Sequence, residues 1–151
     1  MLDSDLLSPA RILARVRVSS KKRLFELIST TLASKSPELD SREIFESICA
    51  REHLGSTALG NGIAIPHGRI SGTNDVQALF LQLIKPLPFD ADDNQPVDLV
   101  FALTVPEDCS GDHKKLISDI VERFSEPELL ERLRSAEDAN QIWQFLSSSH
   151  A

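Results

Sequence analysis

The chain has 151 residues, 41% of them hydrophobic, and a formal net charge of −7. It is long enough for one well-buried core and too short for two comfortable domains. The acidic balance argues against a general nucleic-acid or anionic-membrane binder, because such binding needs clustered Lys and Arg. Its apolar runs are far shorter than the roughly 18 residues of a membrane span, and no signal-peptide pattern opens the sequence. We therefore expect one soluble, cytoplasmic domain over 1–151, with 1–10 frayed or forming a short helical turn.

Cysteine usage and one basic segment bear on environment and partners. Cys49 and Cys109 form no C-x-x-C pair and are too few for a disulfide framework, which fits buried thiols in a reducing compartment. The basic segment runs against the acidic whole and comprises Arg11, Arg15, Arg17, Lys21, Lys22 and Arg23. Such a segment is either a solvated face or a docking patch for an acidic partner.

The first elements expected are an edge strand and a helix. Apolar residues at 14, 16 and 18 alternate with two arginines, which is typical of a half-buried strand over 12–18. Ser19 or Ser20 then offers an N-cap for a helix that ends between Lys35 and Pro37. The apolar stripe of this helix consists of Leu24, Leu27, Ile28, Thr31 and Leu32.

A second helix is expected from Asp40 to about Glu52. Asp40 followed by Glu43 has the form of a capping box, in which both side chains satisfy backbone N–H groups at the helix start. Arg51 falls in the last turn, directly before a glycine-bounded loop over 55–60. An arginine there either complements the negative end of the helix dipole or serves that loop.

The next stretch delivers one histidine into a glycine-bracketed opening. Ile63 and Ile65 share one face of a short strand that stops at Pro66, so His67 is expected just past a strand end. The bracketing glycines, Gly60, Gly62 and Gly68, permit positive φ and the close approach of a phosphate or another molecule's backbone. His67 is therefore either an exposed reactive side chain or an ordinary loop histidine.

The remaining pattern predicts two long strands followed by helices. A strand over 78–84 ends at the prolines 86 and 88, a polar loop follows, and the near-continuous apolar run 97–106 is typical of a central strand covered on both faces. Helical stripes then extend over 111–125, from Pro127, and over 139–146. Together these elements predict an α/β sandwich with helices on both faces of the sheet. His113 lies in the first turn of its helix, where the dipole favours a neutral imidazole that either holds an anion or has no function.

No cofactor or metal site is predicted. Gly55 and Gly60 have P-loop spacing, but Asn61 and Gly62 stand where a Lys and a Ser or Thr are needed. Cys109 and His113, even with Asp112 or His67, lack a defined third metal ligand. The aspartates between 90 and 93 lack the glycine and terminal glutamate of an EF-hand loop.

Several segments together resemble a known family. They are Arg51-Glu52-His53-Leu54-Gly55-Ser56-Thr57, Gly60-Asn61-Gly62-Ile63-Ala64-Ile65-Pro66-His67-Gly68, Phe89-Asp90, Asp93-Asn94-Gln95-Pro96-Val97-Asp98-Leu99 and Phe101-Ala102-Leu103. Over nearly the whole chain they are similar to the EIIA domain of the fructose/mannitol class of the bacterial phosphotransferase system, above all to its nitrogen-regulatory branch, EIIA-Ntr. The resemblance implies a mixed β-sheet flanked by helices.

The resemblance also assigns roles to residues. It implies that His67 is the phosphorylated histidine, with Arg51 and His113 beside it in the active site. A neutral imidazole is a competent nucleophile, and an arginine fork suits phosphoryl oxygens. Residues expected to support the phosphate loop are Ser56, Thr57, Gly60, Asn61, Gly62 and Gly68. Sugar-transport members resembling mannitol EIIA carry a glutamate at the position of Asn61, which favours the regulatory branch.

The implied partners follow from the same resemblance. The phosphoryl donor is NPr, an HPr-like carrier charged by the Ntr Enzyme I from phosphoenolpyruvate, and the regulated targets include potassium transporters and sensor kinases. No metal or nucleotide is expected, because the implied donor is itself a phosphohistidine. The resemblance implies a phosphohistidine carrier rather than a stand-alone turnover enzyme. Two alternatives stay open: a sugar-specific EIIA that passes phosphate to a separate EIIB, and a protein-binding module with vestigial phosphorylation.

Overall fold

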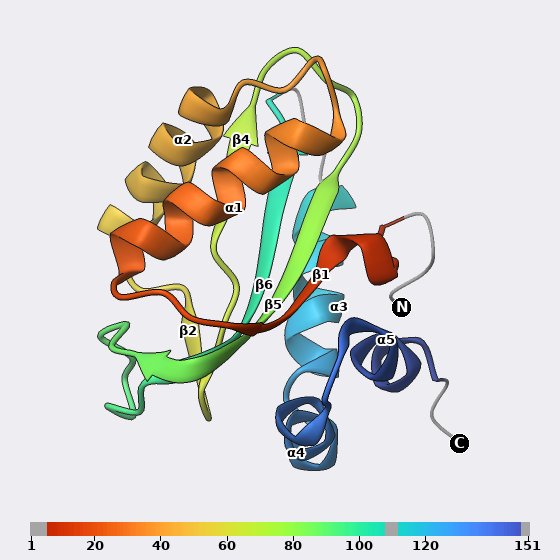
Figure 1. The fold of residues 1–151 in the computed structure, drawn as a ribbon. Helices are drawn as coiled ribbons and strands as arrows, with labels where there is room; N and C mark the ends of the chain where they lie inside the picture. The colour runs from red at the N-terminus through yellow and green to blue at the C-terminus, as the bar shows by residue number, and fades with distance from the viewer. Residues whose placement is uncertain (1–5, 108–111, 149–151) are drawn as a thin grey trace.

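A mixed sheet of six strands, with helices on both faces, forms the body of the computed structural model, which describes residues 6–107 and 112–148 (Figure 1). In chain order the elements are η1 (Pro9–Arg11), β1 (Ile12–Val16), α1 (Lys21–Lys35), α2 (Ser41–His53), β2 (Ala58–Gly60), β3 (Ile63–Ala64), β4 (His67–Ile70), β5 (Gln77–Leu87), β6 (Val97–Pro106), α3 (Asp112–Arg123), α4 (Pro127–Ser135) and α5 (Ala139–Ser147). In Figure 1, α1 and α2 lie on one side of the sheet and α3, α4 and α5 on the other. The predicted α/β sandwich is confirmed.

The strand β6 is the centre of the sheet, whose order is β1-β5-β6-β3-β2 with β4 also paired to β6. It runs antiparallel to β5 and parallel to β3 and β4. Leu99, Phe101 and Leu103 pack with the apolar side chains of α3 to α5, whereas Val100 and Ala102 pack with those of α1 and α2. Burial on both faces explains the uninterrupted apolar run, as predicted for this strand.

The edge strand β1 departs from the predicted alternation. Arg15 has φ +54°, and the register against β5 shifts between Leu13 and Val16. As a result Ala14 packs on the side of α3 to α5, while Val16 packs on the side of α1 and α2. The prediction that these two residues share a face is wrong because the irregularity reverses the pleat between them.

Local capping signals were predicted with partial success. Ser20 caps α1 by accepting a hydrogen bond from the backbone N–H of Arg23 at 3.1 Å, and α1 ends at Lys35 as predicted. Asp40 caps α2 through the N–H of Arg42 at 3.0 Å. The capping box is wrong in its second half: the Glu43 carboxylate accepts hydrogen bonds from Ser71 N (3.0 Å) and Oγ (2.8 Å), which ties α2 to the turn after β4.

Two short strands near His67 were missed. The segment predicted as a loop contains β2, and His67, although past the end of β3, is also the first residue of β4. Strands this short carry little periodicity, and their partners lie elsewhere in the chain. β2 pairs with β3, and β4 pairs with β6, where His67 lies opposite Leu103, whose N–H donates to Pro66 O at 3.0 Å. The strand β5 also extends beyond its predicted end through an exposed Pro86.

No helix among the described residues is both long enough and apolar enough to cross a membrane.

Pro127 stands at the start of α4, as predicted, and Asp138 caps α5 by accepting from Gln141 N at 2.9 Å.

Candidate functional site

The His67 imidazole is half-buried at the start of β4, and one of its nitrogens is already engaged. Nδ1 lies 2.8 Å from the carbonyl oxygen of Ile65. Because a carbonyl can only accept a hydrogen bond, Nδ1 carries the proton, and in the neutral ring the lone pair is on Nε2. The geometry thus selects Nε2 as the nucleophilic atom.

The surroundings of His67 also favour the neutral ring. Burial lowers the pKa of His67 below its ordinary value, and the positive charge of Arg51 acts in the same direction. The hydrogen bond to Ile65 and the negative charge of Glu52 oppose this shift of the pKa without reversing it. At neutral pH the imidazole is therefore a free base with an available lone pair.

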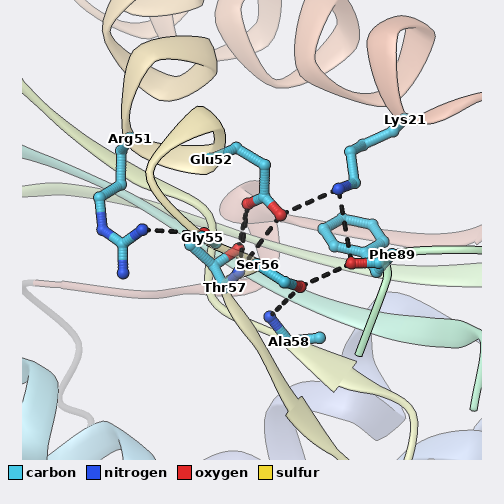
Figure 2. Close-up of polar contacts among 8 residues, drawn as sticks. All are labelled: Lys21, Arg51, Glu52, Gly55, Ser56, Thr57, Ala58 and Phe89. Carbon is cyan, nitrogen blue, oxygen red and sulfur yellow. Dashed lines mark hydrogen bonds and ion pairs between the residues drawn. The ribbon is translucent and has the colours of Figure 1, made fainter. Parts of the chain in front are cut away.

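Arg51 projects from the last turn of α2 and folds back on the loop that follows. Its Nη1 donates a hydrogen bond to Gly55 O at 3.0 Å (Figure 2). Within the described part of the chain this is the single hydrogen bond of the guanidinium, which leaves further N–H donors for an anion. Arg51 is thus held by the loop, and its positive charge lowers the pKa of His67. That it binds a phosphoryl group, rather than only complementing the helix dipole, remains a prediction.

Glu52 is a central polar residue that sequence reasoning did not single out. Its side chain is only 7% exposed, and its carboxylate accepts from Lys21 Nζ (2.9 Å), from Thr57 Oγ1 (2.6 Å) and from Thr57 N (3.2 Å). Figure 2 shows Lys21 from α1 and Thr57 from the loop converging on this carboxylate at the end of α2. The segment containing Glu52 was noted for its family resemblance, but nothing local in the sequence indicates contacts with Lys21.

Ser56 and Thr57, predicted to support the phosphate loop, use their hydroxyl groups inside the protein. Ser56 Oγ donates to Phe89 O at 2.6 Å and accepts from Ala58 N at 3.2 Å. Thr57 is buried, and its carbonyl accepts from the N–H of Ile65 at 3.0 Å. Ile65 is also the residue whose carbonyl holds the His67 ring. Both side chains thus fix the shape of the loop; that this shape serves a bound phosphate remains a prediction.

Gly60 ends β2, and Asn61 and Gly62 form the turn into β3, at the opposite end of β3 from His67; none of the three is next to His67 in the chain. Their φ angles are +93°, +59° and +82°, a region that glycine and asparagine tolerate best. Asn61 N donates to Asp93 Oδ2 at 2.8 Å, and Arg134 Nη2 donates to Asn61 O. These contacts anchor the turn that leads into the histidine strand.

The positive φ expected at Gly68 is wrong, and support of a bound phosphate by this residue remains a prediction. Its φ is not positive; the residue is buried against α2, where an added Cβ would overlap Ser47 Oγ and lie 3.0 Å from Ile48 N. Ser47 Oγ also donates to Arg69 O at 2.7 Å. The glycine therefore admits the protein's own helix, which carries Arg51, against the strand that carries His67.

The other predicted site residues are only partly described. His113 is placed in the first turn of α3, but its side chain lies outside the described residues, as does all of Cys109. No group of three or more His, Cys, Asp or Glu that could hold a metal occurs among the described residues. Cys49 is half-buried against the apolar side chains of α1 and α2, and burial raises the pKa of its thiol.

Three residues of the basic segment lie in two different environments. Lys21 is paired with Glu52, whereas Arg17 and Arg23 line a shallow groove beside α1 together with Lys85. Docking of an acidic partner on this face remains a prediction.

Comparison with known proteins adds independent information. Residues 5–149 match the sequence model of the family described as "Phosphoenolpyruvate-dependent sugar phosphotransferase system, EIIA 2". A nitrogen regulatory protein of Pseudomonas aeruginosa is 44% identical over 142 residues, covering 94% of this chain and 92% of the relative. The crystal structure of nitrogen regulatory protein IIA-Ntr from Neisseria meningitidis superposes with a TM-score of 0.89 at 38% identity, covering 95% and 97% of the two chains. IIA mannitol from Escherichia coli, at 18% identity with a TM-score of 0.77 over 93% of this chain and 99% of its own, shares the fold.

Proposed function

The chain belongs to the EIIA 2 family of the phosphoenolpyruvate-dependent sugar phosphotransferase system, and we propose that it is a regulatory phosphocarrier of the nitrogen-regulatory type that accepts a phosphoryl group on His67. The observation that carries this proposal is the state of the ring: Nδ1 is occupied by the Ile65 carbonyl, and the pKa is lowered by burial. A ring so held presents Nε2 as a nucleophile at neutral pH.

Phosphoryl transfer to His67 needs no external base, because the attacking nitrogen, Nε2, carries no proton. Nε2 of His67 forms a bond to phosphorus while the N–P bond of the donor phosphohistidine breaks, and the released electron pair returns to the donor ring. The His67 Nδ1 proton stays in place, where the Ile65 carbonyl stabilises the positive charge that develops on the ring. No metal or nucleotide enters this step because the phosphoryl group arrives already activated.

Arg51 supplies the charge that the transferred group needs. The equatorial phosphoryl oxygens carry negative charge in the transition state, and a guanidinium fork can bind two of them at once. The hydrogen bond to Gly55 O holds one arm of the guanidinium before the donor arrives. His113, at the start of α3, is proposed as a second group beside the phosphoryl oxygens.

The donor and the targets are proposed from the same relationship. We take the donor to be an NPr-type carrier, related to HPr and charged by an Enzyme I of the Ntr type from phosphoenolpyruvate. Potassium transporters and sensor kinases are the proposed targets, read through the phosphorylation state of His67. The nitrogen regulatory relatives support this regulatory assignment over sugar uptake, since the likeness to IIA mannitol supports the fold alone.

A reconstituted phosphorelay tests the proposal. Incubation with phosphoenolpyruvate, Enzyme I and NPr is expected to add one acid-labile phosphoryl group, seen by intact-mass spectrometry. His67→Ala abolishes the gain, whereas His53→Ala, an exposed histidine at the end of α2, keeps it. Absence of any gain in the wild-type protein would refute the proposal. Equally rapid transfer onward to fructose- or mannitol-type EIIB proteins would favour the sugar-specific alternative.

Target binding tests the remaining alternative, a module whose histidine chemistry is vestigial. A candidate target such as the cytoplasmic domain of a sensor kinase is titrated with the phosphorylated and unphosphorylated protein. A difference in affinity supports a regulatory carrier. Equal affinities for both forms and for His67→Ala support the vestigial module.

A further inference from the structure

Glu52 is next to Arg51 in α2, and hydrogen bonds through Thr57 and Ile65 connect it with His67. We propose that Glu52 is a positioning residue for phosphoryl transfer: its carboxylate holds the 54–57 loop, and this loop fixes the Arg51 guanidinium and the His67 imidazole relative to each other. The inference rests on the proposed function of His67. It adds a residue and a mechanism that neither the comparisons nor the sequence assigns.

A continuous chain of hydrogen bonds leads from Glu52 to the nucleophile. The carboxylate accepts from both the N–H and the hydroxyl of Thr57. Thr57 O accepts from Ile65 N at 3.0 Å, and Ile65 O accepts from His67 Nδ1 at 2.8 Å. Displacement of Thr57 therefore moves the carbonyl that fixes the tautomer and orientation of the His67 ring.

The position of the Arg51 guanidinium depends on the same loop. Arg51 precedes Glu52 in the last turn of α2, and its guanidinium is held by Gly55 O at 3.0 Å. Gly55 and Thr57 flank Ser56, so the carbonyl that holds Arg51 and the residue bound by Glu52 belong to one short segment. Figure 2 shows Arg51 and Glu52 leaving the end of α2 toward this segment. A loop fixed by Glu52 thus sets the positions of the phosphate ligand and the phosphate acceptor together.

Lys21 completes the arrangement from α1. Its ammonium lies 2.9 Å from Glu52 Oε2 and 4.6 Å from the centre of the Phe89 ring. Phe89 O in turn accepts from Ser56 Oγ at 2.6 Å, so Lys21 and the loop share a second anchor. Lys21 also compensates the charge of Glu52, which otherwise would repel the dianionic phosphoryl group arriving at His67.

The charge of Glu52 acts on His67 in a way that a purely structural residue does not. Glu52 raises the pKa of His67, whereas Arg51, the neighbouring residue of α2, lowers it. Neutralising Glu52 is therefore expected to lower the His67 pKa further. Removing Lys21 leaves the carboxylate uncompensated and is expected to raise it.

The experiment compares Glu52→Gln with a matched control, Glu43→Gln. Glu43 is on the same helix, and its carboxylate likewise accepts from the N–H and hydroxyl of one residue, Ser71, away from the 54–57 loop. Phosphorylation of His67 by phospho-NPr is followed at several donor concentrations, the His67 ring is titrated by NMR, and the unfolding midpoint is measured for each variant.

Glu52→Gln is expected to slow transfer at saturating donor by about ten-fold or more, because small misplacements of reacting groups cost such factors. Its half-saturating donor concentration should change by less than about two-fold, and its His67 pKa should fall. Glu43→Gln is expected to lose stability while keeping the wild-type rate and His67 pKa. Lys21→Met shifts that pKa the opposite way.

Two outcomes overturn the inference: a folded Glu52→Gln protein that is phosphorylated at the wild-type rate, or a loss of rate matched by the Glu43→Gln control. If Glu52→Gln does not fold, Thr57→Val replaces it, since it removes the hydroxyl donor and keeps the side-chain shape; an unchanged rate in that variant refutes the inference. Failure of the proposed function looks different, because the wild-type protein itself then gains no phosphoryl group.

Discussion

Gly68→Ala perturbs the contact between α2 and β4 with a single methyl group. An ideal Cβ at this position overlaps Ser47 Oγ, lies 2.9 Å from Ser47 Cβ and lies 3.0 Å from the backbone nitrogen of Ile48. The hydroxyl can rotate away, but the other two atoms are fixed by the helix. The methyl group is therefore accommodated only if α2 moves away from β4.

The size of the effect follows from these contacts. Overpacking of a well-packed interior costs about 1–3 kcal/mol. Rotation of the Ser47 hydroxyl also gives up its hydrogen bond to Arg69 O at 2.7 Å, for about 1 kcal/mol. We expect Gly68→Ala to lower the free energy of unfolding by about 2–4 kcal/mol. Since α2 carries Arg51, the shift also separates the guanidinium from His67 and slows phosphorylation in the molecules that remain folded.

Urea unfolding and the phospho-NPr assay measure the two effects. Ser47→Ala alone is the control, with a loss of about 1 kcal/mol or less. Combined with Gly68→Ala it removes the overlapping oxygen, so the double variant should lose less stability than the sum of the single variants. A Gly68→Ala protein within about 0.5 kcal/mol of wild type, with an unchanged rate, would show that the close approach of α2 to β4 is not required.

Three further predictions concern Arg51, His67 and Gln82. Arg51→Ala is expected to slow phosphorylation by about 100-fold and to cost at most about 1 kcal/mol of stability as a helix-end cation; equal losses in rate and stability assays would reduce Arg51 to a helix cap. Because the pKa of His67 is lowered on folding, the unfolded chain binds more protons than the folded protein below about pH 6.5. The free energy of unfolding of the wild-type protein should therefore fall as the pH decreases below that value, and that of His67→Gln should fall less. Urea titrations at several pH values check this difference. Gln82→Leu removes the hydrogen-bond partner of Arg15 N and of the carbonyls of Leu133 and Ala136. It should lower the free energy of unfolding in urea by about 3 kcal/mol without changing the phosphorylation rate of the folded protein. A loss smaller than about 1 kcal/mol contradicts this prediction.

The parts of the fold that were predictable are those encoded by neighbours in the sequence. Ser20 and Asp40 cap the helices they precede, and the apolar run of β6 reports burial on both faces. The missed features depend on distant residues. Glu43 has the spacing of a capping box, yet Ser71 offers its carboxylate two donors, so tertiary contact overrides the local pattern.

The same distinction applies to the site. His67 and Arg51 were predicted from motif and family resemblance, and in the structure the positive charge of Arg51 lowers the pKa of His67. Glu52 was not predicted, because its hydrogen-bond partners, Lys21 and Thr57, belong to another helix and to a loop. Gly68 was identified for the wrong reason: a sequence shows that a Cβ is absent, but not which part of the chain occupies the space.

The break between β3 and β4 explains how a histidine in a sheet remains reactive. Both strands pair with β6 in one register, Ala64 opposite Val100 and His67 opposite Leu103, so the chain behaves as a single strand interrupted at Ile65 and Pro66. At this interruption Ile65 O accepts from the His67 ring instead of from a neighbouring strand. Pro66 supports the break because it has no N–H to lose from a ladder. The interruption thus frees the Ile65 carbonyl to hold Nδ1, while the strand pairing on either side fixes the backbone that carries the ring, so the lone pair of the neutral imidazole is on Nε2.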